Sequence, residues 1–437
     1  NGWPALHLDD VSGIPFLKDI VGVEQYQLRA RVRARDQDVY ITTCREIPAY
    51  QDYCTEMLGL GRPEHIQAPV VSIPIRIAEA AQSGAPFRQL VHIARQLGSM
   101  VIHPYMGIEP VWRLARRLNI VSGARVAVLA PPPPVTWYAN NKINFTRCVE
   151  EVIGPEVLVD RRIANNAEDL TTGLLELAEA HPLVALKMGR CASAMGNKRF
   201  ESDILKRQSR SQIVSEVEQF LREKEWIRGR EVLAVAWAST DLSPSTQMWI
   251  PPIGGGEPFV DGVYEQILVG VERMFLGSIP AQFDAALQER IVELSLMVGR
   301  VYQELGYVGQ CSFDFIIVDD KPLFVECNGR WGGTSTPMRF MDRLFPDHRP
   351  AYRARDHVSE KLKGLPFTAV LEMLGDTLYD ARTGNGSYII YNVGCQPEYG
   401  KLDVIAIGDD MTTATALLEE QLPELLGEPV HSPDNDL

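Results

Sequence analysis

Four polar residues lie in an otherwise apolar stretch near residue 320. Between positions 311 and 335 the sequence reads CSFDFIIVDDKPLFVECNGRWGGTS, in which Asp314, Glu326, Asn328 and Arg330 stand among aliphatic and aromatic neighbours. Removing a charge from water costs several kcal/mol unless a partner or a metal ion compensates it. Two carboxylates, an amide and a guanidinium in one apolar segment therefore need a common explanation.

The residue pattern predicts that this stretch is a β-hairpin. Two apolar runs flank the turn-forming sequence Asp-Asp-Lys-Pro. Because side chains alternate along a strand, we expect Glu326 and Asn328 on one face together with Phe324. Asp314 joins them if it pairs with residue 326 or 328. Opposed Cβ atoms are then roughly 4.5–5.5 Å apart, so the three polar side chains could share one or two ions.

Two carboxylates at this spacing repel each other unless a cation lies between them. Ligand sets made only of oxygen suit Mg²⁺, with Mn²⁺ as a substitute, and Mg²⁺ typically completes its shell with water and substrate phosphates. We therefore predict that Asp314, Glu326 and Asn328 bind metal beside a nucleotide. The alternative interpretation is a hairpin with an exposed polar face, or a buried ion pair that involves Arg330.

Other residues fit a phosphate site less specifically. Lys187 ends an apolar strand and precedes a loop in which Gly189, Ser193 and Gly196 would let backbone N–H groups approach phosphate oxygens. Lys142 begins a predicted helix and could reach a phosphate, although a lone lysine there is more often solvated. The chain has neither the P-loop spacing nor a Rossmann G-x-G-x-x-G motif.

Adenine and substrate contacts have weaker candidates. The strand VLAVAW places Val235, Ala236 and Trp237 where an adenine edge could meet them, and a plain core strand is the alternative. Gln266 and Arg339 are candidates to bind a substrate carboxylate, but a structural role explains each equally well.

Composition limits the class of protein. The 437 residues are 45% hydrophobic, enough for two or three domains with sizeable cores. A formal net charge of −14 argues against binding nucleic acid or anionic membrane through the overall field. The seven cysteines are scattered without a C-x-x-C pair, which favours a reduced, cytoplasmic protein. The histidines lack zinc-ligand spacing.

Hydrophobic periodicity predicts an alternation of helices and strands. The first 130 residues have a β-α-β rhythm, with helices expected over 87–97 and from 109. The prolines at 131–134 are expected to be a stiff connector, because proline continues neither a central strand nor a helix. A long helix over 287–305 leads into the hairpin. The predicted domains are residues 1–134, an α/β domain; 135–231, a lobe with the phosphate loop; and 232–437, a lobe with the metal-binding hairpin.

The order of these parts resembles the ATP-grasp superfamily from about Trp137 to the C-terminus. Within it, the chain is similar to peptide ligases of the pheganomycin type, through the segments VIHPYMGIEPVWRLARRLNI, PPPPVTWYANNKINF, LSPSTQMWIPP and YEQILVGVERMFLGSIPAQF. The resemblance implies an α/β (α+β) protein, in which a Rossmann-like pre-ATP-grasp domain precedes an ATP-grasp fold.

The resemblance also implies residue roles and cofactors. ATP and Mg²⁺ would be bound, and Arg330 would face the reacting carboxyl group. Similar enzymes often have Glu or Gln in the hinge strand, where Val235 and Ala236 stand here, so the ribose contact is unassigned. The resemblance implies that Lys142 and Lys187 contact the ATP phosphates. It also implies that residues 189–198 form a loop that closes over the phosphates and that residues 232–237 line adenine.

The implied activity is ADP-forming ligation of a carboxylate to an amine through an acyl phosphate. The substrates would be an amino acid, a modified amino acid or a short peptide, as in natural-product biosynthesis, and a homodimer is expected. No protein nucleophile is required, so Cys311 and Cys327 are expected to pack as small hydrophobic residues. Two alternatives stay open: an ATP-grasp carboxylase or purine-type ligase, and a nucleotide-binding regulatory subunit without turnover.

Overall fold

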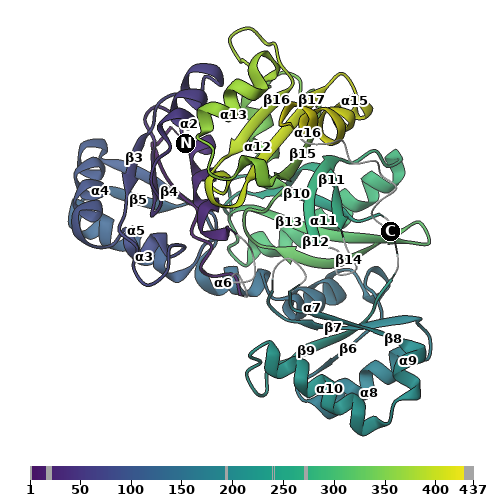
Figure 1. Cartoon of the computed structure of the whole chain (residues 1–437). Helices are drawn as coiled ribbons and strands as arrows, with labels where there is room; N and C mark the ends of the chain where they lie inside the picture. The colour runs from purple at the N-terminus through teal and green to yellow at the C-terminus, as the bar shows by residue number, and fades with distance from the viewer. Residues whose placement is uncertain are drawn as a thin grey trace.

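The computed structural model describes residues 2–15, 22–191, 195–238, 240, 242–269 and 274–427. These residues form a five-stranded, an eight-stranded and a four-stranded sheet. In Figure 1 the N-terminal sheet lies on the left, the large sheet fills the centre and right, and the four-stranded sheet forms a lobe below them. Predicted site residues come from the large sheet, the small lobe and the helix between them.

The N-terminal sheet is parallel, with strand order β3-β2-β1-β4-β5. The chain order reverses between β1 and β4, and ligands of open α/β sheets bind outside the carboxyl ends of strands at such a point. The helices predicted near 87–97 and from 109 are confirmed. The elements are β1 (Ala5–Leu8), β2 (Val39–Thr42), β3 (Glu64–Gln67), β4 (Ser99–Pro104), β5 (Arg125–Val128), α3 (Ile77–Ala80), α4 (Gly84–Leu97) and α5 (Glu109–Ser122).

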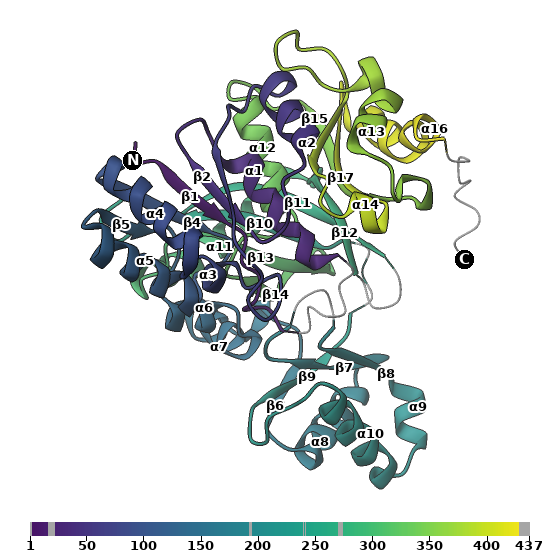
Figure 2. The ribbon, with the colours of Figure 1, turned by 60° about the vertical axis from the view of Figure 1, so that its left-hand side comes forward.

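Short helical segments connect the N-terminal sheet to the C-terminal part of the large sheet. Figure 2 shows α1 and α2 between these two parts of the molecule. The backbone N–H of Ile390 donates to the Tyr53 hydroxyl across this boundary at 3.1 Å. The segments are η2 (Val23–Arg29), α1 (Ala30–Arg33), α2 (Pro48–Asp52) and the π-helix η3 (Tyr53–Met57).

The prolines at 131–134 are not wholly the connector that we expected. Pro133 and Pro134 begin α6 (Pro133–Ala139), because the first turn of a helix needs no intrahelical N–H bond and suits the fixed φ of proline. α7 (Lys142–Val152) follows, and the side chain of its N-cap Asn141 accepts from the N–H of Ile143 at 2.9 Å. This cap fixes the backbone at Lys142.

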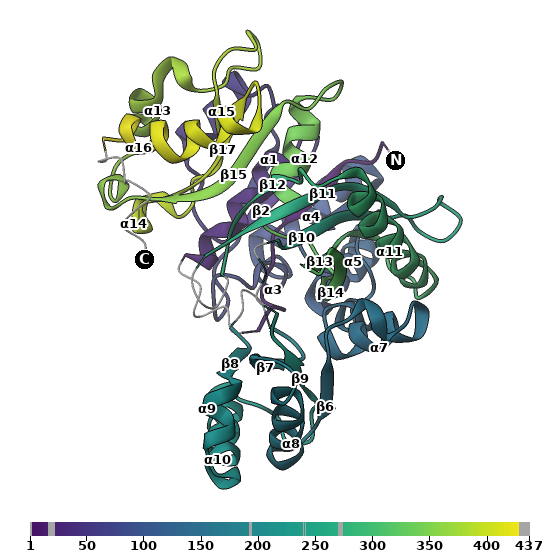
Figure 3. The same ribbon diagram turned by 90° about the vertical axis from the view of Figure 1, so that its right-hand side faces the viewer.

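The small lobe contains an antiparallel sheet of order β6-β9-β7-β8. Figure 3 shows α8 and α10 covering the outer face of this sheet. β9 lies beyond residue 231, so this sheet uses residues from both predicted lobes of the ATP-grasp region. The elements are β6 (Arg161–Ala164), β7 (Leu183–Met188), β8 (Asn197–Glu201), β9 (Val232–Ala236), η4 (Pro155–Val157), α8 (Ala167–Ala178), α9 (Ser202–Arg207) and α10 (Arg210–Glu223).

The large sheet has strand order β14-β13-β10-β11-β12-β15-β17-β16. The predicted long helix is α11 (Ala285–Glu304), which packs against β10 and β11. The strands are β10 (Pro244–Ile250), β11 (Phe259–Val269), β12 (Met274–Pro280), β13 (Gly309–Val318), β14 (Lys321–Asn328), β15 (Ala351–Val358), β16 (Tyr388–Asn392) and β17 (Lys401–Gly408). The remaining helical elements are α12 (Ser335–Leu344), η5 (Glu360–Leu362), α13 (Phe367–Leu374), η6 (Gly375–Thr377), α14 (Gln396–Tyr399), α15 (Met411–Ala416), η7 (Leu417–Gln421) and α16 (Leu422–Leu425).

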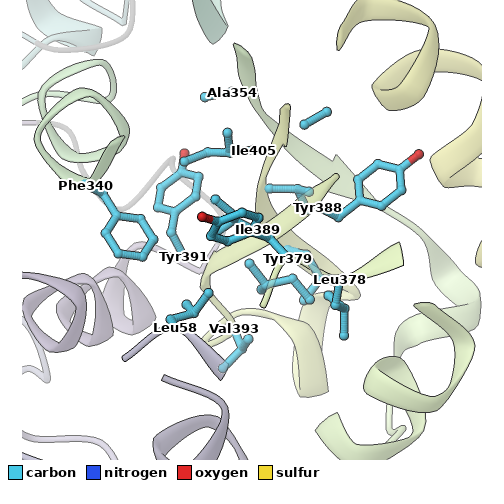
Figure 4. Close-up of a cluster of buried hydrophobic side chains, with 14 of the residues drawn as sticks. Leu58, Phe340, Ala354, Leu378, Tyr379, Tyr388, Ile389, Tyr391, Val393 and Ile405 are labelled. Atoms are coloured by element: carbon cyan, nitrogen blue, oxygen red, sulfur yellow. The ribbon is translucent and has the colours of Figure 1, made fainter. Parts of the chain in front are cut away.

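Large apolar clusters hold these layers together. Figure 4 shows one of them, in which side chains of β16 such as Ile389 and Tyr391 pack with Leu58 of the N-terminal region and Phe340 of α12. All seven cysteines are free, and Cys311 and Cys327 are buried as predicted. Among the described helices, none combines the length and apolarity that crossing a lipid bilayer requires.

Candidate nucleotide and metal site

The hairpin has the register that brings its carboxylates together. Asp314 of β13 pairs directly with Glu326 of β14, and Ser312 pairs with Asn328. The prediction for Phe324 was wrong, because a β-bulge follows the first pair and Phe315 then pairs with Phe324. The bulge turns the Phe324 ring into the core, where it lies 4.3 Å from the Phe315 ring centroid.

Asp314 is buried against its carboxylate neighbour. Burial and the charge of Glu326 raise the pKa of Asp314 to about 7. The hydroxyl of Ser245 donates to Asp314 Oδ1 at 2.7 Å, and Asn328 Nδ2 donates to Oδ2 at 2.9 Å. Asp314 therefore keeps its proton to a higher pH than an ordinary carboxyl group does.

Glu326 has a cation in contact. Lys142 Nζ forms an ion pair with Glu326 Oε2, and although burial opposes the change, Lys142 lowers the pKa of Glu326. Lys142 is itself buried, not solvated. Its backbone N–H donates to the carbonyl of Gly189 at 2.8 Å, which joins the start of α7 to the loop after β7.

Lys187 has no ion pair among the described residues. Burial lowers its pKa, and its ammonium lies 5.2 Å from the ring centroid of Trp237. A buried cation without a carboxylate partner is costly, and an anionic ligand would compensate it. Lys187 thus presents an unpaired positive charge to the same cavity that contains the carboxylate pair.

Arg330 follows the hairpin and is held from three directions. Its Nη2 donates to Asn328 Oδ1 at 2.9 Å, and its Nη1 donates to the Trp331 carbonyl at 3.0 Å. The Asn140 side chain both accepts from the N–H of Gly329 at 3.1 Å and donates to its carbonyl at 3.0 Å. The guanidinium therefore projects from a backbone segment that is clamped on α6.

The N-terminal sheet also holds this segment. The N–H of Trp331 donates to the carbonyl of Tyr105, directly after β4, at 3.1 Å. The Arg33 guanidinium lies 4.5 Å from the centroid of the Trp331 ring, and the His103 ring packs edge-on at 5.3 Å. Arg33 is buried and paired with Asp9, the residue after β1. The carboxyl ends of β1 and β4 thus support the loop that carries Arg330.

A cavity of about 680 Å³ lies where the sheets meet. The predicted site residues that line it are Lys142, Lys187, Val235, Ala236, Trp237, Gln266, Asp314, Glu326, Asn328 and Arg330. Arg339 is not among its lining residues, because it pairs with Asp261 through two hydrogen bonds of 2.9 and 2.6 Å.

The phosphate-loop residues are placed in part. Ser193 lies outside the described residues. Gly189 and Gly196 do not themselves line the cavity, but Cys191 and Met195 of the same loop do. A Cβ on Gly196 would lie 2.6 Å from the Cβ of Cys191, so only glycine allows the loop to fold back this closely.

Sequence reasoning missed several residues at the site. Ser245 bonds Asp314, Asn140 clamps the loop, and Tyr105 lies 6.0 Å from the Arg330 guanidinium. Asp356 and Lys401 line the far end of the cavity. The alternation of charged and apolar residues in YRARDHV and KLDVIAIG was an available signal for the last two.

Comparison with known proteins identifies the fold. No family model matches the sequence, and no curated protein matches it. Among solved structures, N5-carboxyaminoimidazole ribonucleotide synthetase from Thermus thermophilus matches with a TM-score of 0.55 at 15% identity over 98% of this chain and 100% of that chain. The chain has an ATP-grasp fold.

Two further ATP-grasp structures carry ligands. The synthase from Aspergillus clavatus, in complex with ADP and 5-aminoimidazole ribonucleotide, has a TM-score of 0.58 at 12% identity over 98% of this chain and 99% of that one. The biotin carboxylase domain of Hydrogenobacter thermophilus 2-oxoglutarate carboxylase, with MgADP, ADP and bicarbonate, has a TM-score of 0.58 at 12% identity over 96% and 89%. The fold prediction, with its Rossmann-like N-terminal sheet, is confirmed. The narrower resemblance to pheganomycin-type ligases finds no support here.

The hairpin fits the metal that we predicted. Two carboxylates face each other, and the charge of Glu326 raises the pKa of Asp314, so a divalent cation would remove their repulsion. The donor set contains only oxygen, as Mg²⁺ prefers. No group of three His, Cys, Asp or Glu side chains with metal-site spacing occurs in the described part of the chain. Substrate phosphates and water would have to complete the shell.

Proposed function

We propose that this ATP-grasp protein is an ATP-dependent ligase that joins a carboxylate to an amine with release of ADP and phosphate. The observation that carries the proposal is the charge pattern of the cavity. Lys187, a half-buried lysine without an ion pair among the described residues, faces the same space as the opposed pair Asp314 and Glu326 and the clamped Arg330. Phosphoryl transfer to a carboxylate requires charge neutralisation of this kind and no protein nucleophile.

Each residue has a role in this proposal. Lys142 and Lys187 bind the ATP phosphates, and the strand that ends at Trp237 lies along adenine. Asp314, Glu326 and Asn328 hold Mg²⁺, which would supply positive charge to the phosphates. Asn328 could bind the metal once its amide oxygen no longer accepts the hydrogen bond from Arg330.

Arg330 then orients the substrate carboxylate toward the γ-phosphate. Attack by a carboxylate oxygen on phosphorus expels ADP and forms an acyl phosphate. The amine next attacks the acyl carbon, phosphate leaves, and the amine gives up a proton. Water must be kept out between these steps, because hydrolysis of the acyl phosphate would consume ATP without product.

An isotope experiment tests the first step. The protein is incubated with ATP, Mg²⁺, a pool of amino acids and dipeptides whose carboxyl groups carry ¹⁸O, and unlabelled amines. We expect ADP formation that depends on the pool, with one ¹⁸O in each released phosphate and an amide product by mass spectrometry. Phosphate without ¹⁸O would overturn activation of a carboxylate. Nucleotide binding without any turnover would favour a regulatory subunit instead.

A second candidate is an ATP-dependent carboxylase. It is favoured by the structures that match, because the biotin carboxylase domain holds bicarbonate and MgADP and the synthetases are named for a carboxylated amine. Both reactions phosphorylate an oxygen of a carboxylate or of bicarbonate and then form a bond from the activated carbon to nitrogen, with phosphate as the leaving group. Labelled bicarbonate distinguishes them: acid-labile ¹⁴C in the product, with turnover that fails when bicarbonate is removed, would indicate the carboxylase.

A further inference from the structure

The cavity extends far beyond the metal hairpin. Its floor includes side chains from β14 and β13, then Ser245 and Gln247 of β10, Gln266 of β11, Leu276 of β12 and Asp356 of β15. It continues to Lys401 of β17 and Tyr391 of β16. The cavity thus crosses the whole width of the eight-stranded sheet, and ATP at the hairpin would fill only one end.

The far end carries four charged side chains at the junction of η2 with β15 and β17. Arg29 donates Nε to Asp403 Oδ2 at 2.8 Å, and Lys401 pairs with Asp356. Lys401 Nζ also donates to the Tyr26 hydroxyl at 2.6 Å. All four are largely buried, with side-chain exposures from 1% for Asp403 to 24% for Asp356.

The charges that line the cavity are unequal in number. Arg29, Lys401 and Asp356 line it, whereas Asp403 lies behind Arg29 and is not a lining residue. The wall therefore presents two cations and one anion. Arg29 uses Nε and Nη2 on Asp403, which leaves its Nη1 as a donor, and Lys401 has a third N–H beyond those used on Asp356 and Tyr26. This end therefore offers two N–H donors on cationic side chains, which a carboxylate could accept.

The number of strands between the hairpin and the far end of the cavity indicates how long a ligand must be to contact both. β15 is five strands along the sheet from β14, or roughly 24 Å at about 4.8 Å per step. One residue of an extended chain spans at most about 3.6 Å. An acceptor that extends along the sheet from Arg330 to Lys401 would therefore be longer than a single amino acid. The intervening wall is mixed, with the polar residues Ser245, Gln247 and Gln266 and the apolar residues Leu268, Leu276 and Ala354.

We propose that Lys401 and Arg29 form a subsite for the distal carboxylate of an elongated acceptor, whose amine reacts beside Arg330. This inference rests on the ligase function proposed above and names the shape and charge of the acceptor. Lys401 binds the carboxylate directly, Arg29 supplies the second donor, and Asp403 keeps Arg29 charged and oriented. The part of the cavity wall between the hairpin and Lys401 contacts the middle of the acceptor.

The test compares acceptors that differ only in the distal group. Random-sequence peptide libraries of two, four and six residues, as C-terminal acids or amides, are assayed for ADP formation with the pooled carboxylates. In the unchanged protein we expect the longest acids to have kcat/KM at least tenfold above their amides, and dipeptides to show no such preference. In Lys401→Gln the difference between acids and amides should disappear.

Two further variants separate binding from folding. Lys401→Gln leaves Asp356 unpaired, so the double variant Asp356→Asn with Lys401→Gln removes both charges at nearly constant volume. It should also lose the preference for acids. Replacing the exposed pair of Asp52 and Arg62 by Asn and Gln is the matched control and should keep the preference.

The outcomes distinguish the two proposals. ADP formation with equal rates for acids and amides, or a preference that survives in Lys401→Gln, would overturn the subsite alone. The subsite would also be overturned if the preference for a C-terminal acid belonged to the substrate that donates the carboxylate and not to the amine acceptor. No stimulated ADP formation with any library would overturn the ligase function and this inference together.

Discussion

The two ends of the cavity contain the same motif with different charge pairing. At the hairpin, Asp314 faces Glu326 across neighbouring antiparallel strands, and at the far end Asp356 faces Asp403 in the same way. In both pairs burial raises the pKa of one carboxyl group, to about 7 for Asp314 and about 6 for Asp356. Each pair also has nearby cations, which are Lys142, Lys187 and Arg330 at the hairpin and Arg29 and Lys401 at the far end.

The difference lies in where the cations are. At the far end each carboxylate has its own partner, Arg29 for Asp403 and Lys401 for Asp356. At the hairpin Lys142 contacts Glu326, while Asp314 has only hydroxyl and amide donors, from Ser245 and Asn328. An opposed carboxylate pair is therefore not by itself a sign of metal binding. Among the described residues no cation forms an ion pair with Asp314, and this supports the proposal that a metal ion binds there.

The largest expected effect tests that assignment. Glu326→Gln removes one ligand charge with little change in volume, and we expect kcat to fall on the order of a thousandfold, the equivalent of about 4 kcal/mol. The measurement is phosphate release from ATP at saturating Mg²⁺, with circular dichroism to confirm folding. Glu257→Gln, at an exposed residue paired with Arg300, is the control and should keep normal turnover. Near-normal activity of Glu326→Gln would refute the metal site.

The second prediction concerns stability and distinguishes paired from unpaired carboxylates. Arg29→Met leaves Asp403 buried without its partner, and we expect the free energy of unfolding to fall by about 3–5 kcal/mol. Asp314→Asn removes repulsion from Glu326, so in the absence of Mg²⁺ at pH 8 it should raise that free energy. Urea unfolding without divalent cations measures both. Equal destabilisation by the two variants would contradict the difference in pairing.

Local patterns in the sequence predict only some of the structural features that distinguish the two carboxylate pairs. Alternation along β14 and the short turn limited the partner of Asp314 to residue 326 or 328, and periodicity located α4, α5 and α11. The bulge that turns Phe324 into the core depends on a single extra residue in β14, which alternation does not reveal. Pro133 can begin a helix as well as break one, so the proline run was ambiguous.

Non-local contacts account for the rest. Arg29 and Asp403 are 374 positions apart, and Asp356 and Asp403 lie in strands whose pairing the sequence did not indicate. Arg339 looked like a substrate ligand because its partner Asp261 lies 78 residues earlier. The tertiary structure determines which charged side chains line the cavity and which partner each of them has.

The smallest expected effect is on the pH dependence of metal binding. The pKa of Asp314 is about 7 in the metal-free protein, against an ordinary value of 3.8. Between these values the folded state binds more protons than the unfolded chain, so this group makes the metal-free protein less stable as pH rises from about 4 to about 7. Mg²⁺ competes with that proton. Its apparent affinity should therefore weaken about fivefold from pH 7 to pH 6 and change little above pH 8.

The measurement is the Mg²⁺ concentration that gives half of the thermal stabilisation by Mg²⁺ and ADP, taken at intervals between pH 5.5 and 8.5. ADP itself titrates in this range, so the informative quantity is the difference between the unchanged protein and Asp314→Asn, whose amide has no proton to lose. We expect the variant to bind Mg²⁺ more weakly and to retain only the nucleotide's own pH dependence. Asp356 also titrates near pH 6, but its proton has no competing metal, so Asp356→Asn should leave the curve unchanged. The same pH dependence of the half-saturating Mg²⁺ concentration in the unchanged protein and in Asp314→Asn would mean that Mg²⁺ does not displace the proton of Asp314. The two carboxylate pairs would then not differ in metal binding.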